Sequence, residues 1–352
     1  MMPGTREIMR GLTMNQILIG DCKELLKTIP DKTVHCCVTS PPYYGLRDYG
    51  ADGQIGLERS PEEYVASLVE VFREVWRVLR DDGTVWLNLG DSYAGSGKGG
   101  AKYPENAGNY KQGTNRGSIG KPAVTAVNFG DIKPKNLIGI PWRVAFALQA
   151  DGWYLRSDII WHKPNPMPES VTDRPTKAHE YIFLLSKSER YYYDYEAIKE
   201  PASTTRPDLL EFGPRPDKGF TGHMNDRRRK KTDDHENRTV KGFNDRWDAK
   251  EGVGENPKTR NKRDVWTVAT QGSTIPHFAM FPEKLIEPCI LAGCPEGGVV
   301  LDPFFGAGTT GVVAAKHFRD YIGIELNPEY AQIAEARIGE TMGLFNVTEA
   351  IT

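Results

Sequence analysis

The sequence predicts an open α/β sheet covered by helices. At residues 299–316 an apolar strand is followed by a glycine turn and the start of a helix. A second apolar strand, residues 321–324, follows that helix and ends at Glu325, about twenty residues beyond the glycine turn. Ligands of open α/β sheets bind beyond the carboxyl ends of the strands. Four polar side chains directly follow predicted strands: Asp21, Ser40, Asp302 and Glu325.

Length and composition are those of a soluble globular protein. The chain has 352 residues, of which 39% are hydrophobic and 26% charged, enough for one large α/β domain and a smaller element. The formal net charge of −2 creates no global positive field. A surface that binds nucleic acid would therefore have to be a local patch.

The five cysteines predict neither a disulfide framework nor a zinc site, because their number is odd and no CxxC pair is present. We expect no metal. No apolar run approaches the ~18 residues of a membrane span. Residues 1–14 lack an apolar signal core and are expected to be a loose leader. These features predict a protein of the reducing cytoplasm.

Apolar patterning places the other elements in order. The helix over residues 61–80 is the clearest, since Leu68 and Phe72 recur at helical spacing behind Pro61 at its start. Residues 84–89 alternate between apolar and polar, as a strand does. The other predicted strands are 16–19, 34–39, 154–161 and 179–185, and the other predicted helices are 22–29, 136–150 and one that starts at 281.

Two consecutive prolines follow the strand over residues 34–39, in the run Ser40-Pro41-Pro42-Tyr43-Tyr44. Proline fixes φ and lacks a backbone donor, so the chain cannot continue a ladder there and forms a stiff loop. This loop, which we call the shelf, would present a hydroxyl, free carbonyls and two aromatic rings at the edge where ligands bind.

Gly306 and Gly308 allow a tight turn and a close approach of the backbone to a ligand. Thr309 and Thr310 are expected to cap the following helix, whose first N–H groups favour an anion. The turn lacks the third glycine of a dinucleotide fingerprint, and no P-loop lysine follows. A nucleoside with a carboxylate therefore fits better than one with a pyrophosphate, although ordinary βαβ units also carry such turns.

Two segments lack sustained periodicity. Residues 92–134 are expected to form a loop insertion over the site. Residues 200–262 separate a first half of the domain, 15–199, from a second half, 263–352. They are either a solvated, partly disordered surface or a target-recognition element facing nucleic acid. They carry a basic run: Arg227, Arg228, Arg229, Lys230 and Lys231.

The order of these motifs resembles that of the permuted β class of amino-methylating DNA methyltransferases. Residues 40–43 resemble the catalytic Ser-Pro-Pro-Tyr motif of that class, and residues 302–310 resemble its cofactor loop. Residues 323–326 resemble its ribose-binding segment. The remaining matches are the acidic turn near the adenine ring at 20–21, the motif facing the flipped base at 159–163, and the segment closing over the methionine moiety at 277–285.

The resemblance implies a Rossmann-like methyltransferase fold with a mostly parallel seven-stranded sheet, one antiparallel strand and helices on both faces. It implies S-adenosyl-L-methionine as cofactor and double-stranded DNA as substrate, and it allows a cognate restriction endonuclease as partner. The implied catalytic residues are Ser40, Pro41, Pro42 and Tyr43. The implied cofactor-binding residues are Asp21, His277, Phe278, Pro282, Glu283, Asp302, Phe304, Gly306, Gly308, Thr309, Thr310 and Glu325. The residues expected to contact DNA are Tyr44, Lys163 and the basic run 227–231.

In this class a serine motif is typical of cytosine N4 enzymes, and aspartate or asparagine is typical of adenine N6 enzymes. Ser40 therefore favours the N4 amine of a flipped cytosine, with adenine N6 as the alternative. The Ser40 oxygen and the Pro41 carbonyl would accept the amine hydrogens, and Tyr43 would stack on the base. Ring-carbon methylation would need a thiolate, but Cys289 is interpreted as core packing. A non-catalytic DNA-binding module and a small-molecule methyltransferase are the remaining alternatives.

Overall fold

A computed structural model of the chain describes residues 14–45, 53–94, 132–201, 259–270 and 280–349. The chain divides into two compact units, one made of residues 1–197 and 263–352 and the other of residues 198–262. In the second unit the described residues form a short antiparallel pair of strands, β6 (Glu200–Pro201) and β7 (Thr259–Arg260). An ion pair between Glu200 and Arg260, 2.8 Å long, links these two strands.

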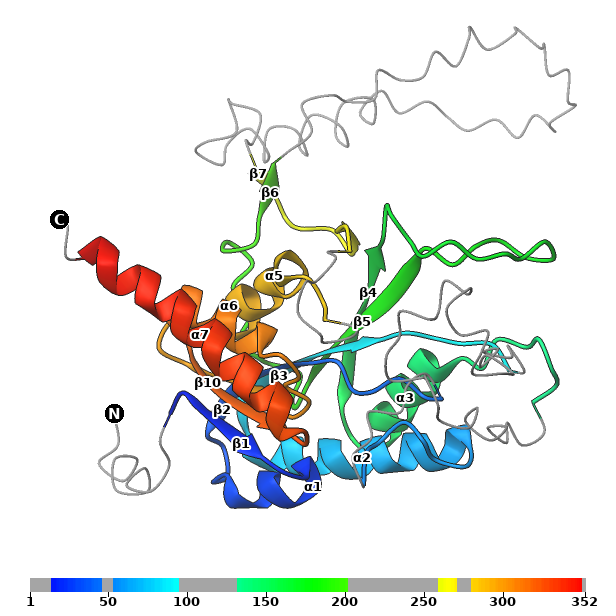
Figure 1. Ribbon diagram of the computed structural model, residues 1–352, viewed down its shortest axis with the longest axis horizontal. Helices are drawn as coiled ribbons and strands as arrows, with labels where there is room; N and C mark the ends of the chain where they lie inside the picture. Colours follow the sequence, from blue (N-terminus) through cyan, green and yellow to red (C-terminus); the bar gives the residue numbers. More distant parts are fainter. Residues whose placement is uncertain (1–13, 46–52, 95–131, 202–258, 271–279, 350–352) are drawn as a thin grey trace, which may run out of the picture. The chain divides into compact units, whose positions relative to one another are not determined.

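The first unit is built on one sheet of eight strands in the order β1-β10-β9-β2-β3-β5-β4-β8 (Figure 1). All neighbours are parallel except at β5, which runs antiparallel to both β3 and β4. The mostly parallel sheet with one antiparallel strand is thus confirmed, with an eighth strand, β8, at the edge. The strands are β1 (Gln16–Ile19), β2 (Val34–Thr39), β3 (Leu79–Leu89), β4 (Tyr154–His162), β5 (His179–Ser186), β8 (Val265–Thr267), β9 (Val299–Asp302) and β10 (Asp320–Glu325).

Helices cover both faces of the sheet, as expected (Figure 1). The first layer holds α1 (Cys22–Leu25), the 3₁₀ helix η2 (Leu26–Thr28), α2 (Pro61–Val78) and α3 (Ile140–Ala150). The second layer holds α5 (Glu283–Gly293), α6 (Thr309–Lys316) and α7 (Pro328–Glu349). Among the described helices, none is both long and apolar enough to cross a membrane.

Several predicted boundaries differ from the structure: β3 begins at Leu79 and not at 84, the helix predicted over 22–29 is α-helical only to Leu25, and the helix predicted from 281 begins at Glu283. Two further differences have local causes. The helix predicted over 61–80 ends at Val78, because Leu79 is extended and already pairs with β2. The helix predicted from residue 136 begins only at Ile140, because Gly139 stands before it at φ +76°. The carboxylate of Asp91 then accepts the N–H groups of Gly139 and Ile140, which satisfies the start of α3.

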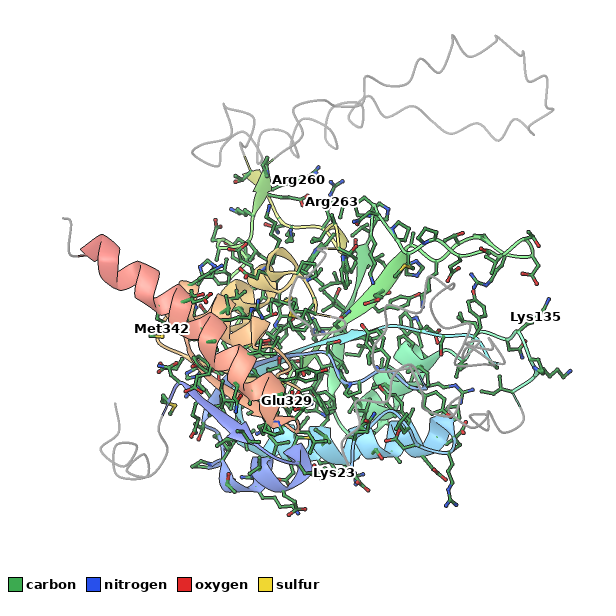
Figure 2. All side chains as sticks on the ribbon, in the orientation of Figure 1. Lys23, Lys135, Arg260, Arg263, Glu329 and Met342 are labelled. Carbon is green, nitrogen blue, oxygen red and sulfur yellow. The ribbon has the colours of Figure 1, made fainter. Side chains whose placement is uncertain are left out.

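The core lies between the sheet and the two helix layers, where the side chains crowd together (Figure 2). The stripe of α2 that the sequence predicts is completely buried, including Leu68 and Phe72. All five cysteines are buried and free of disulfides. Cys289 has no exposed surface, and its Sγ contacts the carbonyl oxygen of Leu285, so its interpretation as core packing is confirmed.

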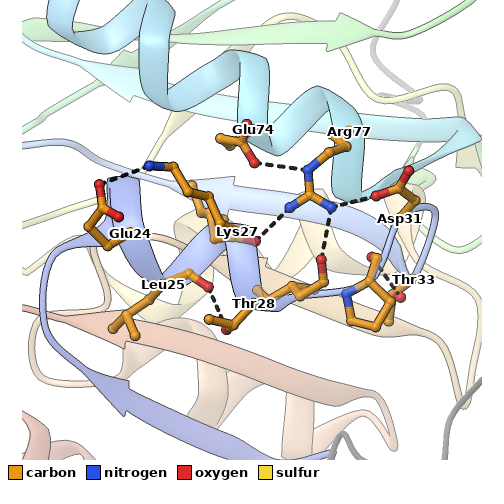
Figure 3. A network of polar contacts seen from close by, with 11 residues as sticks. Glu24, Leu25, Lys27, Thr28, Asp31, Thr33, Glu74 and Arg77 are labelled. Atoms are coloured by element: carbon orange, nitrogen blue, oxygen red, sulfur yellow. Dashed lines mark hydrogen bonds and ion pairs between the residues drawn. The ribbon is translucent and has the colours of Figure 1, made fainter.

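Arg77 ties α2 to the connection between β1 and β2 (Figure 3). Its guanidinium donates to the carbonyl oxygens of Leu26 and Ile29, at 2.8 Å and 2.9 Å, where η2 ends. The same group pairs with Asp31 and with Glu74. One planar donor group therefore satisfies the end of η2 and fixes the approach to β2, the strand that leads into the shelf.

Candidate active site

A pocket opens beyond the carboxyl ends of β1, β2, β9 and β10, with about 960 Å³ of empty space, open solvent included. Ser40 and Pro42 of the shelf line it together with Gly306 and Glu325. The motif order predicts that the shelf and the glycine turn, more than 250 residues apart, meet across one cleft, and their shared lining of this pocket confirms that prediction. The other predicted residues in its lining are Asp21, Asp302, Phe304 and Thr309.

The glycine turn has the conformation that requires glycine. Gly306 has φ +54° and Gly308 has φ +76°, both in the left-handed region that side chains with a Cβ avoid. A Cβ on Gly308 would also lie 2.6 Å from the Cβ of Ala334. The turn thus brings α6 close to both the pocket and α7.

The predicted capping of α6 by threonine is wrong. Gly308 is the N-cap residue of α6, and no side chain makes a capping hydrogen bond. Thr310 instead donates its hydroxyl to Asp302 Oδ2 at 2.7 Å. The first N–H groups of α6 are consequently not used by a capping side chain, which suits a helix start that faces an anionic ligand.

Asp302 clamps the two loops together. Its Oδ1 accepts the hydroxyl of Thr39, the residue before the shelf, at 2.6 Å, and its Oδ2 accepts that of Thr310. The N–H of Phe304 also donates to Oδ1, at 3.0 Å. Burial raises the pKa of Asp302 to about 6, against the opposing effect of these hydrogen bonds. The Asp302 carboxylate therefore holds the end of β2, the start of α6 and the loop after β9 together at the wall of the pocket.

Glu325 occupies the end of β10, where an acidic residue was predicted to face a ribose. Its Oε2 accepts the N–H of Gly306 at 2.7 Å and its Oε1 accepts the N–H of Asn327 at 2.8 Å. Burial raises the pKa of Glu325 above its usual value. The backbone of Leu326 also bonds this carboxylate. A carboxylate has about four lone-pair sites, so Glu325 both supports the glycine turn and keeps acceptor capacity for hydroxyl groups in the pocket.

The opposite wall of the site is a chain of polar side chains behind the shelf. Ser40 donates to Asn88 Oδ1 at 3.3 Å, and the same oxygen lies 3.1 Å from the hydroxyl of Tyr43. Tyr43 also donates to Glu180 Oε2 at 2.7 Å, and Lys163 forms an ion pair with Glu180 Oε1. Burial, followed by the charge of Glu180, holds the pKa of Tyr43 well above its usual value.

Several predicted residues lie outside the pocket lining. Pro282 is the N-cap residue of α5, and Glu283 pairs with Lys316 and Arg337. Pro41 is a buried residue of the shelf. The predicted catalytic and cofactor-binding residues that do not line the pocket are Pro41, Tyr43, Gly308, Thr310, Pro282 and Glu283.

The structure corrects the prediction that Tyr44 faces DNA, while the role predicted for Lys163 stays a prediction. Tyr44 is 2% exposed, with its ring 5.5 Å from that of Tyr64 in the core, so it offers no surface to a duplex. The side chain of Lys163 is 18% exposed and lies over the ring of Trp161, paired with Glu180. The predictions for His277, Phe278 and the basic run Arg227, Arg228, Arg229, Lys230 and Lys231 fall outside the described residues.

Sequence reasoning missed Asn88 and Glu180. Asn88 is 4% exposed at the end of β3. A polar residue among the apolar residues of the strand over 84–89 was a usable signal for it. Glu180 is close to the site only because β5 is antiparallel, which brings its first residues to the edge where β3 ends. Patterning along the chain does not predict that pairing. Met280 and Phe281 also line the pocket, and both belong to the predicted segment 277–285. The pocket residues that were also missed include Cys22, Gly53, Gln54, Ile55, Asn327 and Tyr330.

Known proteins share both the sequence and the fold of this chain. Residues 34–336 match a family model named for N6 and N4 methyltransferases and described as a DNA methylase. Type II methyltransferase M.Cfr9I of Citrobacter freundii is 46% identical over 94% of this chain and 90% of its own length. Type II methyltransferase M.SmaI of Serratia marcescens is 45% identical over 92% of this chain and 90% of its own length.

Two solved structures are similar to this chain in fold. The PvuII DNA methyltransferase, described as cytosine-N4-specific, has a TM-score of 0.56 at 18% identity and covers 95% of this chain and 92% of its own. A putative DNA modification methylase from Thermus thermophilus, complexed with S-adenosyl-L-methionine, has a TM-score of 0.51 at 23% identity. The match covers 92% of this chain and 95% of that protein. Because the family model matches residues 34–336 and two relatives named Type II methyltransferases are 45–46% identical, the chain belongs to the N6/N4 family of DNA methyltransferases.

Proposed function

We propose that this enzyme methylates the exocyclic N4 amine of cytosine in double-stranded DNA. The observation that carries the proposal is that Ser40 of the shelf and Gly306 of the cofactor turn line one pocket. A methyl donor and a base amine held on these two walls would meet in the same cleft. Holding two reactants in place is the main contribution an enzyme makes to a displacement that needs no covalent intermediate.

The pocket residues fit S-adenosylmethionine. Glu325 offers buried carboxylate oxygens for two ribose hydroxyls, and Asp21 stands on the neighbouring strand end. The glycine turn and the start of α6 suit the carboxylate of the methionine moiety. An apolar part of the pocket wall is formed by Met280, Phe281 and Phe304. When bound, this cofactor supplies an electrophilic methyl group on a sulfonium.

Ser40 has the chemistry that an exocyclic amine needs. The lone pair of such an amine is delocalised into the ring, so the amine is a poor nucleophile until its hydrogens are held by acceptors. The Ser40 oxygen and the Pro41 carbonyl are neutral acceptors suited to that task. Tyr64 donates to the carbonyl oxygen of Pro42 at 2.9 Å, which stiffens the shelf that presents them.

The base must leave the duplex to enter this cleft, and we propose that it is flipped and stacked against Tyr43. The observed hydrogen bond from Tyr43 to Glu180 holds the phenol by its hydroxyl, which leaves ring faces for contact. Ring-carbon chemistry would need a thiolate, and Cys22 lines the pocket, but burial raises the pKa of its thiol to about 12. Cys36 and Cys37 are buried, and burial raises the pKa of both thiols well above the usual value.

The choice of cytosine N4 over adenine N6 rests on serine at position 40, the residue typical of cytosine N4 enzymes in this class. Transfer of tritium from labelled S-adenosylmethionine to duplex DNA, followed by digestion to nucleosides, tests it. Label on N4-methylcytosine supports the proposal, and label on N6-methyladenine reverses the base. Label only on RNA, protein or small molecules would reject the substrate class.

We also propose that the enzyme serves a restriction–modification system, because the relatives with 45–46% identity are named Type II methyltransferases. Sequencing that detects modified bases, applied to DNA from cells expressing the protein, reports base and target site together. A host extract that cuts unmodified but not modified DNA at that site would identify a cognate endonuclease. The basic run 227–231 is proposed to contact phosphates, so neutralising it should weaken DNA binding and flatten its salt dependence.

A further inference from the structure

The hydroxyl of Tyr43 has one proton, two amide or carboxylate oxygens that could accept it, and the hydroxyl of Ser40 as a further hydrogen-bond partner. Glu180 Oε2 lies 2.7 Å from the Tyr43 oxygen, and Asn88 Oδ1 lies 3.1 Å from it. A hydrogen bond to a carboxylate is shorter and stronger than one to a neutral amide oxygen. The Tyr43 hydroxyl therefore donates its hydrogen bond to Glu180, and Asn88 Oδ1 accepts no hydrogen bond from Tyr43.

This assignment sets the direction of the next hydrogen bond. Asn88 Nδ2 donates to the carbonyl oxygen of Tyr181 at 3.0 Å, which fixes the amide so that Oδ1 faces Ser40. Ser40 lies 3.3 Å from that oxygen and donates its proton there. The lone pairs of the Ser40 oxygen then remain for the pocket, where an amine must find an acceptor and not a competing donor.

Glu180 is held where this ordering requires it. Its Oε1 pairs with Lys163, and both side chains are less than a fifth exposed, at 18% for Lys163 and 16% for Glu180. The ammonium of Lys163 lies 4.1 Å from the ring centroid of Trp161, and the indole of Trp161 donates to the carbonyl oxygen of Val268 at 2.8 Å. Each carboxylate oxygen thus has a different partner, one a fixed cation and the other Tyr43.

We propose that Glu180, paired with Lys163, is a positioning residue for methyl transfer. By accepting the hydrogen bond of the Tyr43 hydroxyl, Glu180 leaves Asn88 Oδ1 free to accept the hydrogen bond of Ser40. The Ser40 oxygen then stays an acceptor toward the target amine. This role rests on the proposed function only in its last step, the use of the Ser40 oxygen by the amine. The hydrogen-bond order itself is a property of the free protein.

The order in the free protein is tested by NMR with tyrosine labelled at Cζ. The Tyr43 signal is assigned by its loss in Tyr43→Phe. Glu180→Gln, which removes the charged acceptor, should move that signal. Glu169→Gln, a matched loss of charge from the Glu169–Arg174 pair, should leave it in place. An unmoved Tyr43 signal in Glu180→Gln would overturn the assignment, whatever the enzyme methylates.

The role in turnover is tested by a double-mutant cycle under saturating cofactor. In Glu180→Gln, Tyr43 turns its proton to Asn88 and displaces Ser40, so kcat should fall roughly tenfold, as expected when a charge-assisted hydrogen bond is lost. Tyr43→Phe removes the competing hydroxyl and should cost less. Adding Tyr43→Phe to Glu180→Gln should therefore restore kcat to about the level of Tyr43→Phe alone.

A purely structural role for Glu180 predicts the opposite, a double variant at least as slow as Glu180→Gln. That result, or a kcat of Glu180→Gln equal to that of Glu169→Gln, would overturn the positioning role. Cofactor affinity and thermal unfolding of each variant separate these outcomes from misfolding. If the wild-type enzyme labels no DNA, the proposed function fails, while the NMR experiment still decides the hydrogen-bond order.

Discussion

The two walls of the pocket are built by different means. The cofactor wall is made largely by backbone: Gly306 and Gly308 in left-handed conformations, with a glutamate bonded to two N–H groups. On the shelf wall Ser40 and Pro42 line the pocket, and behind Ser40 lie side chains that bond to one another, from Asn88 through Tyr43 to Glu180. Backbone geometry tolerates almost no substitution, whereas a side-chain network is adjusted by exchanging single groups.

We therefore expect substitutions on the two walls to affect different quantities: the affinity for S-adenosylmethionine on one wall and the turnover rate on the other. Changes on the cofactor wall should alter binding of S-adenosylmethionine, because the ligand approaches the backbone closely there. Changes on the shelf wall should alter turnover with little effect on that binding. Five predictions test this division.

The largest effect is expected for Gly306→Val. A β-branched residue at φ +54° is strained, and its side chain would enter the space where the ligand approaches the turn. The dissociation constant for S-adenosylmethionine should rise by more than about 1,000-fold, to no detectable binding in calorimetry. Gly339→Ala is the control, since a Cβ there meets nothing within 4 Å. Binding by Gly306→Val within a few-fold of wild type would contradict the proposed cofactor wall.

On the shelf wall, Ser40→Ala should lower kcat by roughly 100- to 1,000-fold, a loss typical for a group that orients a proton-bearing reactant. Its cofactor affinity should stay within about threefold of wild type, because Ser40 does not support the glycine turn. Single-turnover kinetics and calorimetry on the same preparation measure the two quantities. Near-normal turnover would remove Ser40 from the proposed mechanism.

Asp302 joins the two walls and should make stability depend on pH. Its pKa rises from the ordinary 3.8 to about 6 on folding, so its contribution to stability is complete below about pH 4 and is lost as pH rises through about 6. The loss amounts to about 3 kcal/mol at most. Urea unfolding at pH 4 and pH 7 should show this change in wild type and lose most of it in Asp302→Asn. An equal pH dependence in both proteins would show that Asp302 does not titrate in this range.

Tyr43→Ala should slow turnover by roughly 10- to 100-fold, the range expected for loss of one aromatic stack on a base. Cofactor affinity should again change little. The measurement also compares Tyr43→Phe, which keeps the ring. Equal turnover in the two variants would show that the ring faces do not hold the base.

The smallest effect on activity is expected for Cys289→Ala. Cys289 has no exposed surface, so its removal should leave turnover unchanged and lower the free energy of unfolding by about 1 kcal/mol. Assays of methyl transfer and urea unfolding check both. Complete loss of transfer with normal stability would instead indicate thiolate chemistry at a ring carbon.

The sequence predicted the cofactor wall more fully than the shelf wall, for a physical reason. The strand, turn and helix over 299–316 are contiguous, so local patterning places Gly306 and Asp302 without tertiary information. The polar chain behind Ser40 joins β3, β4 and β5, and it depends on one strand being antiparallel. Patterning identified those strands but not their register, and so Glu180 and its ion pair with Lys163 were missed.

The strand order also determines when the pocket can form during synthesis of the chain. β1 and β2 leave the ribosome first, yet β10 and β9 must later insert between them. Asp302 follows Thr39 by 263 residues, which is roughly 13–53 s of synthesis at about 5–20 residues per second. A nascent chain that has finished only its shelf has no partner for the Thr39 hydroxyl and no donor-binding turn. The pocket therefore cannot form until β9 and β10 have been synthesised, and chains truncated before Asp302 lack the glycine turn.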